Sequence, residues 1–246
     1  MSDSRHKIID QYTASSTSVD QGLRSYMLKV YAYMFVGLSL TGSLAFLSTQ
    51  VPALQSLLFT QNAAGQWGPS GITWLLSFVQ IGLVLFLSFR IQSLKTATAQ
   101  MIFWAYSALM GLSLSSIFLL YTGASTARVF LITSATFGTM SLYGYVTKRD
   151  LSGLGSFLFM ALIGMILASL VNIFFQSSVT EFVISVIGVL VFTGLTAYDT
   201  QRVKEIYLEQ DSAEVKSKKA IMGALALYLD FINLFILLMR FLGDRR

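Results

Sequence analysis

Residues 221–239 read IMGALALYLDFINLFILLM, and this stretch decides the fold class. It contains no Lys or Arg, and its single acid, Asp230, stands among Leu, Phe and Ile residues. Its 19 residues are close to the roughly 20 that a helix needs to cross the hydrocarbon core of a bilayer. The stretch predicts a transmembrane helix with a carboxyl group in its apolar part, where an ionised carboxylate is costly unless it is protonated, paired or hydrated.

The rest of the chain has the same apolar character. Of its 246 residues, 54% are hydrophobic and 12% charged, and the mean hydropathy is +0.67. Residues 30–89, 96–127 and 151–180 contain no charged side chain. A membrane barrel would instead alternate polar and apolar residues. We therefore expect an all-α integral membrane protein that lies in a lipid bilayer.

Seven apolar spans predict a seven-transmembrane helix bundle. They cover approximately residues 27–47, 72–89, 101–121, 129–146, 155–175, 182–198 and 221–239. Short connections make successive helices pack antiparallel, so residues 27–246 are expected to form one domain. Residues 1–26 are polar and predict a short mobile N-terminal tail. The connection 48–71 contains Pro52 and Pro69 and predicts a long uncharged loop.

The basic residues predict the orientation, because Lys and Arg concentrate in cytoplasmic loops. With a cytoplasmic N-terminus, 13 of the 17 basic residues lie on the inner side and four, Arg128, Arg240, Arg245 and Arg246, on the outer side. The basic C-terminus is then on the unfavoured side, so a seventh segment that enters the membrane and returns stays open as an alternative. The basic residues that set this orientation account for the pI near 9.4. No nucleic acid partner is therefore expected.

Several kinds of chemistry are excluded by composition. The chain has no cysteine, and its one histidine, His6, lies in the N-terminal tail. A histidine-dependent serine protease or a zinc protease in the membrane would need histidine there. A retinal protein would need a lysine in residues 221–239, which have none. We expect no enzyme activity and no cofactor.

Two intramembrane carboxyl groups, Asp199 and Asp230, are the candidate site. Asp230 stands nine residues into its apolar span, roughly 13 Å along a helix at about 1.5 Å per residue. The sixth and seventh spans are joined by a short loop on the inner side, so the two aspartates can meet there. Two carboxylates in a low dielectric cannot both ionise cheaply, so the pair would share one proton. When ionised, the same pair would offer oxygen ligands to calcium.

Other polar and small residues in the spans are weaker candidates. Asn172 and Gln80 could line a pathway, although such amides more often hydrogen-bond between helices. Close helix packing is expected at the glycines within the spans, namely Gly37, Gly42, Gly111, Gly144, Gly164, Gly188 and Gly194.

The strings GLTAYDTQ (194–201), LYLDFINLF (227–235), MSLYG (140–144) and ASLVN (168–172) resemble signature segments of the Bax-inhibitor-type family, most closely its bacterial members. The resemblance implies seven helices with the last enclosed by the other six, in the bacterial cell inner membrane. It also implies a calcium leak governed by pH, with Asp199 and Asp230 as the sensing pair.

The resemblance implies two further roles. Some members pair an arginine late in the second helix with the aspartates, and Arg90 stands near that position, although the loop after it differs in length. Some members carry an acid earlier in the same helix, where this chain has Gln80.

Three functions remain open at this point. The first is a pH-sensitive calcium leak channel gated by Asp199 and Asp230, with calcium as the transported ion. The second is a non-conducting regulator that binds other membrane proteins, such as a protease or a stress-signalling complex, through the tail and residues 202–220. The third is a proton-coupled carrier, for which a carboxyl pair is equally suitable.

Overall fold

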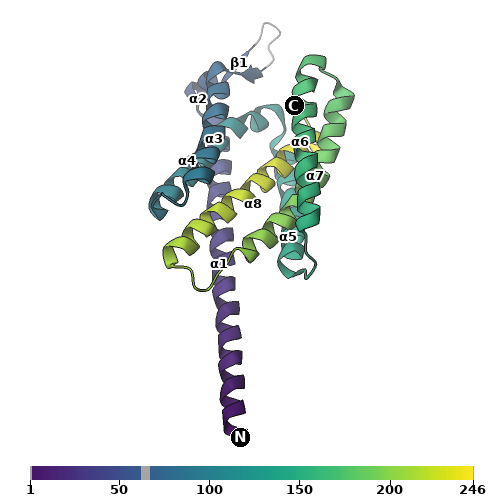
Figure 1. The fold of residues 1–246 in the computed structure, drawn as a ribbon. Coiled ribbons are helices and arrows are strands. Elements are labelled where there is room, and N and C mark those ends of the chain that lie inside the picture. Colours follow the sequence, from purple (N-terminus) through teal and green to yellow (C-terminus); the bar gives the residue numbers. More distant parts are fainter. Residues whose placement is uncertain (1, 62–66, 246) are drawn as a thin grey trace.

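The computed structural model contains a bundle of long helices (Figure 1) and describes residues 2–61 and 67–245, with side chains described for 21–61 and 68–245. Within those residues, seven helices are long and apolar enough to cross a membrane. The elements are α1 (Ser2–Gln50), α2 (Pro52–Leu58), β1 (Phe59–Gln61), β2 (Trp67–Pro69), α3 (Gly71–Arg90), α4 (Thr96–Leu120), α5 (Gly123–Val146), α6 (Ser152–Phe175), α7 (Ser178–Glu205) and α8 (Ala213–Leu242).

The polar N-terminal residues continue the first helix. We expected a mobile tail, but α1 begins at Ser2 and projects from the bundle as one rod (Figure 1). The segment has no proline, and its first glycine is Gly22, so nothing in it breaks a helix that the bundle already nucleates. Farther along α1, Tyr26, Met27 and Val30 are buried in the bundle.

The connection after α1, which we expected to be a long uncharged loop, contains a short helix and two strands among its described residues. Pro52 occupies the first turn of α2, where its missing N–H costs nothing. The strands β1 and β2 then pair antiparallel, with Phe59 opposite Pro69. Ser70 ends this segment and caps α3, since its Oγ accepts a hydrogen bond from the Thr73 N–H.

Capping side chains place the helix starts before the apolar runs. The hydroxyl groups of Thr122, Ser177 and Ser212 accept hydrogen bonds from the backbone three residues later, at the starts of α5, α7 and α8. The helix α8 therefore begins eight residues before Ile221, where its apolar run starts. These helices therefore begin with polar turns that lie outside the apolar runs.

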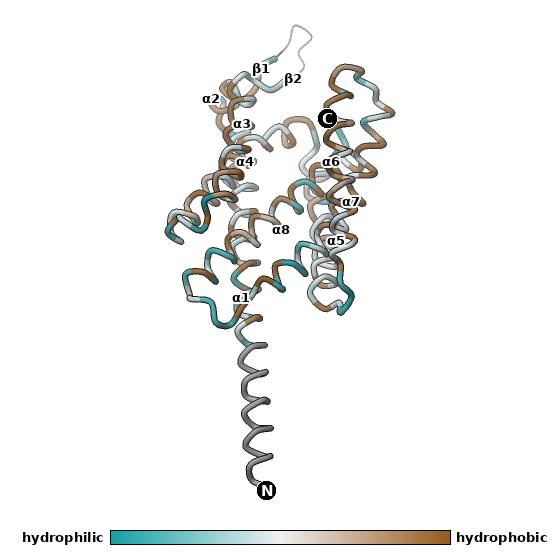
Figure 2. Tube along the Cα trace, viewed as in Figure 1, coloured by the Kyte–Doolittle hydropathy of each residue, from teal (hydrophilic) through white to brown (hydrophobic). Residues whose placement is uncertain are grey.

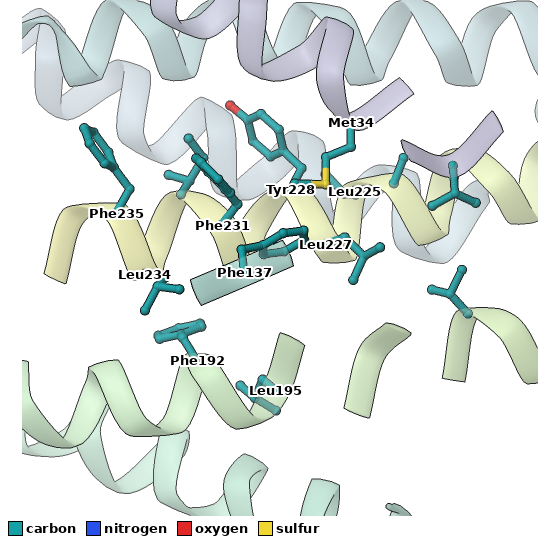
Figure 3. Packing of buried hydrophobic residues seen from close by; sticks show 14 of the residues in the cluster. Met34, Phe137, Phe192, Leu195, Leu225, Leu227, Tyr228, Phe231, Leu234 and Phe235 are labelled. Atoms are coloured by element: carbon teal, nitrogen blue, oxygen red, sulfur yellow. The ribbon is translucent and has the colours of Figure 1, made fainter. Parts of the chain in front are cut away.

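The central helix is α8. Of the residues in its most apolar 18-residue stretch, 72% are buried, whereas the corresponding value for α6 is 6%. It packs directly on α1, α4, α5 and α7, whereas α3 and α6 lie outside, mainly on α4 and α7. Figure 1 shows it running obliquely between α3 and α4 on one side and α5 to α7 on the other. Figure 3 shows Phe231 and Phe137 in the cluster around it. The centroids of these two rings are 5.5 Å apart.

A hydroxyl chain also fixes α8 in the bundle. The Thr41 hydroxyl on α1 donates to the Ser107 carbonyl on α4 at 2.8 Å. The Tyr228 hydroxyl on α8 therefore donates to Thr41 Oγ1, at 2.7 Å. One buried chain of hydrogen bonds thus connects three helices.

The seventh span does not enter the membrane and return. The helix α8 is continuous over 30 residues, and its C-terminal end lies beside the α4–α5 connection, where the Thr122 N–H donates to the Asp244 carbonyl at 3.1 Å. Hydrophilic residues gather at the end of the bundle that carries α1's projecting part, around the α3–α4, α5–α6 and α7–α8 connections (Figure 2). We call this the N-terminal end, and its cytoplasmic orientation stays a prediction.

The predicted glycine contacts are correct at five positions and wrong at two. A Cβ added to Gly37, Gly111, Gly144, Gly188 or Gly194 would collide with a neighbouring helix. A Cβ on Gly42 or Gly164 would meet nothing within 4 Å. These two glycines face open space.

Candidate functional site

Close helix contacts on both sides hold the part of α7 that carries Asp199. Gly144 of α5 lies directly against the Ala197 carbonyl, and Gly155 of α6 lies directly against the Tyr198 ring, so neither position has room for a Cβ. Since backbone and ring approach this closely only where a side chain is missing, α7 is clamped just before Asp199.

The two residues after Asp199 are hydrogen-bonded to other parts of the fold. Thr200 Oγ1 and Ser141 Oγ are 3.0 Å apart. Gln201 Nε2 donates to the Arg149 carbonyl at 2.8 Å, and Gln201 Oε1 accepts from the Leu151 N–H at 2.8 Å. The buried amide of Gln201 thus connects the end of α7 to the α5–α6 connection, a role that no local sequence pattern indicated.

Asp230 lies in the middle of α8 and is 4% exposed. Its Oδ2 atom is buried and receives no hydrogen bond from any N–H or O–H group that the structure describes. The nearest lysine in sequence, Lys219, is engaged elsewhere, because its Nζ contacts Asp211 and the Ile206 carbonyl. Lys219 therefore does not neutralise Asp230.

The carboxyl groups of Asp199 and Asp230 lie in hydrogen-bonding contact with each other. Asp230 is seventeen residues beyond the start of α8, whereas Asp199 is six residues before the end of α7. They meet because α8 crosses the bundle obliquely (Figure 1). Neither ionised carboxylate has a proton to donate, so a hydrogen bond between them needs a proton on one of them.

Both aspartates line one cavity of about 940 Å³ between α6, α7 and α8. Its walls are mostly apolar, and among the residues described its charged members are the two aspartates, Arg202 and Arg240. Arg202 is close enough to Asp199 to interact with it electrostatically. The cavity therefore has a guanidinium group towards each end and the carboxyl pair between them.

A second cavity of about 420 Å³ adjoins the first on the side away from the N-terminal end. The two share Ser169, Ile184 and Arg240 as lining residues. Glu181 also lines the second cavity, and its Oε1 is 3.8 Å from Arg240 Nη1. Together the cavities lead from the far ends of α6 and α7 to the aspartates.

The remaining candidates lie apart from the pair. Gln80 is buried, and its Nε2 donates to Ser113 Oγ at 2.6 Å, which connects α3 to α4. Asn172 lines the second cavity, but its Oδ1 accepts from the Ser177 N–H at 3.0 Å and closes the end of α6. Arg90 is exposed at the end of α3 and makes no hydrogen bond or ion pair to either aspartate among the described residues.

The pair by itself supplies few metal ligands. Among the described residues there is no group of three or more His, Cys, Asp and Glu side chains that could hold a metal ion. Calcium takes six to eight oxygen ligands, so most ligands of an ion at Asp199 and Asp230 would have to be water or backbone carbonyl oxygens.

The fold and the site define an integral membrane protein of seven spanning helices, in which the central helix brings a buried carboxyl group against a second one. The sequence profile of the family described as "Inhibitor of apoptosis-promoting Bax1" matches residues 23–246. The chain belongs to this family, which confirms the resemblance found in its sequence.

Curated relatives match over nearly their whole length. The inner membrane protein YbhL of Escherichia coli (strain K12) is 47% identical over 244 residues, which cover 97% of this chain and 100% of YbhL. An uncharacterized protein of Rickettsia prowazekii is 47% identical over 234 residues, 95% of each chain. An uncharacterized membrane protein of Streptococcus pyogenes serotype M6 is 39% identical, over 92% of this chain and 96% of its own length.

Proposed function

We propose that this protein is a pH-sensitive calcium leak channel of the cell inner membrane, gated by Asp199 and Asp230. The observation that carries the proposal is the contact between these carboxyl groups in a cavity, where Asp230 Oδ2 receives no hydrogen bond from the described residues. The name of the relative YbhL supports the inner membrane as location.

The gate works through one shared proton. When one carboxyl group is protonated, it donates to the other and connects α7 to α8. A hydrogen bond to a charged group contributes about 1.5–3 kcal/mol. When both ionise, two unit charges about 4 Å apart repel by about 4 kcal/mol at an effective dielectric of 20. Loss of the hydrogen bond and gain of the repulsion together change the interaction free energy between α7 and α8 by roughly 6 kcal/mol. A change of this size is enough to shift a closed-to-open equilibrium about 10⁴-fold.

The sign of the pH dependence follows from this. Acid supplies the proton and holds α7 against α8, whereas alkali removes it and loosens the contact. The two adjoining cavities support a route for calcium from the far end of the bundle to the pair. Calcium flux is expected to rise as the pH rises through neutrality.

The test is calcium flux into proteoliposomes of the purified full chain at pH 6 and pH 8. Wild type should conduct faster at pH 8, and Asp199→Asn and Asp230→Asn should lose the difference. Asp150→Asn is the matched control: hydrogen bonds from the Ser152 side chain and backbone lower the pKa of Asp150, so this carboxyl group does not titrate near neutrality. An unchanged pH response in both site variants would overturn the proposal.

The same preparation separates the alternatives. A non-conducting regulator would show no flux in any variant and would lose its protein partners when the projecting residues 2–20 are deleted, whereas a leak should survive that deletion. A proton-coupled carrier would move protons only together with its substrate. A calcium flux that leaves the internal pH constant argues against that carrier.

A further inference from the structure

A crevice between α1 and α5 has no role in the proposed function. The helix α1 packs on α4 and α8, and α5 packs on α7 and α8, so α1 and α5 face each other across a seam. At the N-terminal end this seam opens into a cavity of about 500 Å³. This volume lies within the range of small-molecule sites in proteins, roughly 300–1,000 Å³. A second cavity of about 400 Å³ lies farther along the seam, and no charged residue lines it.

The lining of the first cavity suits an apolar chain. Most of it is hydrocarbon and aromatic surface from residues such as Met27, Leu28, Phe137 and Leu142. Of its three side-chain hydroxyl groups, on Tyr31, Ser141 and Tyr145, the first two hydrogen-bond within the protein. A sugar or a nucleotide would therefore find few hydrogen-bonding partners here.

The hydroxyl groups form a chain with one direction. Thr200 Oγ1 donates to the Thr196 carbonyl at 2.7 Å, so Ser141 donates to Thr200. Tyr31 then donates to Ser141 Oγ, at 2.7 Å. The O–H groups of Tyr31 and Ser141 are therefore both used within the protein.

The single charge in the lining is Arg24, which lies where the crevice meets the N-terminal end of the bundle. Its side chain is exposed and makes no hydrogen bond or ion pair with the residues that the structure describes. A guanidinium group at a membrane edge attracts anionic lipid headgroups and can bind a phosphate through two N–H groups. The cavity thus combines one cationic end with an apolar interior.

Gly138 keeps the crevice open. It lies within α5 and lines the cavity, and a Cβ added there would meet nothing within 4 Å. Glycine inside a helix is less stable than alanine by about 1 kcal/mol. At Gly144 on the same helix that cost is offset by the close approach of α7, whereas at Gly138 no part of the described chain uses the space.

We propose that the α1–α5 crevice is a binding site for one anionic phospholipid, with its phosphate on Arg24 and an acyl chain beside Gly138. The occupant follows from the charge at one end, the mostly apolar lining and the internal hydrogen bonds of Tyr31 and Ser141. The inference is independent of ion conduction and holds whether or not the protein is a channel.

The test is native mass spectrometry of the delipidated full chain in detergent, after addition of phosphatidylglycerol or phosphatidylcholine with the same acyl chains. Wild type should retain one phosphatidylglycerol in preference to phosphatidylcholine. One basic residue near a membrane surface contributes about 1 kcal/mol of lipid binding, so Arg24→Gln should reduce the preference about fivefold. This exposed substitution leaves the folded core unchanged.

Gly138→Leu should fill the crevice and lower retention of both lipids. Two matched controls should behave as wild type: Arg149→Gln, which removes an exposed arginine at the same end, and Gly164→Leu, which fills open space on α6 outside the crevice. Equal retention of both lipids by wild type, or undiminished retention in Gly138→Leu, would overturn the proposal. Either result would mean that the retained lipid belongs to the ordinary lipid layer around the protein and does not occupy the crevice. A dimer that disappears in Gly138→Leu would overturn it in favour of a second copy of the chain.

Discussion

Replacing each aspartate by leucine should change stability by different amounts. Asp230 is almost fully buried with one oxygen lacking a donor, whereas Asp199 is partly exposed and lies near Arg202. In Asp230→Leu the remaining carboxylate is that of Asp199. It still lines the cavity and lies near the positive charge of Arg202. In Asp199→Leu the remaining carboxyl group is the buried one, and it loses the neighbour with which it can share a proton.

The magnitudes follow from burial. Replacing a buried charged group with a hydrophobic one is often neutral or stabilising by about 1–4 kcal/mol, whereas leaving a buried charge without its partner costs about 3–5 kcal/mol. The cavity of about 940 Å³ beside Asp230 has room for the larger leucine side chain. At pH 8 both carboxyl groups of wild type are ionised and repel each other, so removing either one relieves that repulsion. We expect Asp199→Leu, which keeps the buried charge of Asp230, to be less stable than Asp230→Leu by about 3 kcal/mol.

The assay is unfolding of the purified protein in one detergent at pH 8 and pH 6, followed by helical circular dichroism. Acid should narrow the gap between the two variants, because a protonated Asp230 no longer carries a buried charge. The reasoning is refuted if both variants shift in the same direction by the same amount, or if Asp199→Leu is the more stable of the two.

Three further predictions use the same unfolding and flux measurements. Gln201→Ala should destabilise the fold by about 2–4 kcal/mol, because two buried backbone groups lose their partner, and Gln201→Glu by less, since the acceptor oxygen remains; equal losses would contradict this. Gly144→Ala should lower stability by about 1–3 kcal/mol through overpacking against α7, whereas Gly138→Ala on the same helix should raise it by up to about 1 kcal/mol. Arg240→Gln should increase calcium flux at pH 8 by removing a positive charge beside the route, and Arg128→Gln, which lies outside both cavities, should leave the flux unchanged.

Local sequence predicted the helices better than their ends. The apolar runs placed seven spans correctly, because the hydrophobic effect and bilayer thickness set their length. The starts of α5, α7 and α8 were predicted too late, since Thr122, Ser177 and Ser212 cap turns that lie outside the apolar runs. The hairpin of β1 and β2 was missed because strands of three residues carry no usable period.

The candidate site was predicted in part. The cost of a carboxyl group in hydrocarbon identified Asp230, and a short loop between two antiparallel helices indicated Asp199 as its neighbour. The roles of Gln201 and of Gly155 were not predicted, because each depends on which backbone of another helix lies opposite. Gln80 donates to Ser113 Oγ and connects two helices, as amides in helix bundles often do. Asn172 lines the second cavity and also accepts from the Ser177 N–H.

The amino-acid sequence by itself determined that this is a seven-helix membrane protein with two costly carboxyl groups and no cysteine or intramembrane histidine chemistry. These conclusions depend only on composition and on the length of apolar runs. The tertiary structure alone decided that α8 crosses obliquely, that Asp199 and Asp230 meet in one cavity, and that α1 and α5 leave a crevice between them. The physical reason is that α8 is apolar on nearly all sides, so its rotation and tilt follow from the shapes of the helices packed around it.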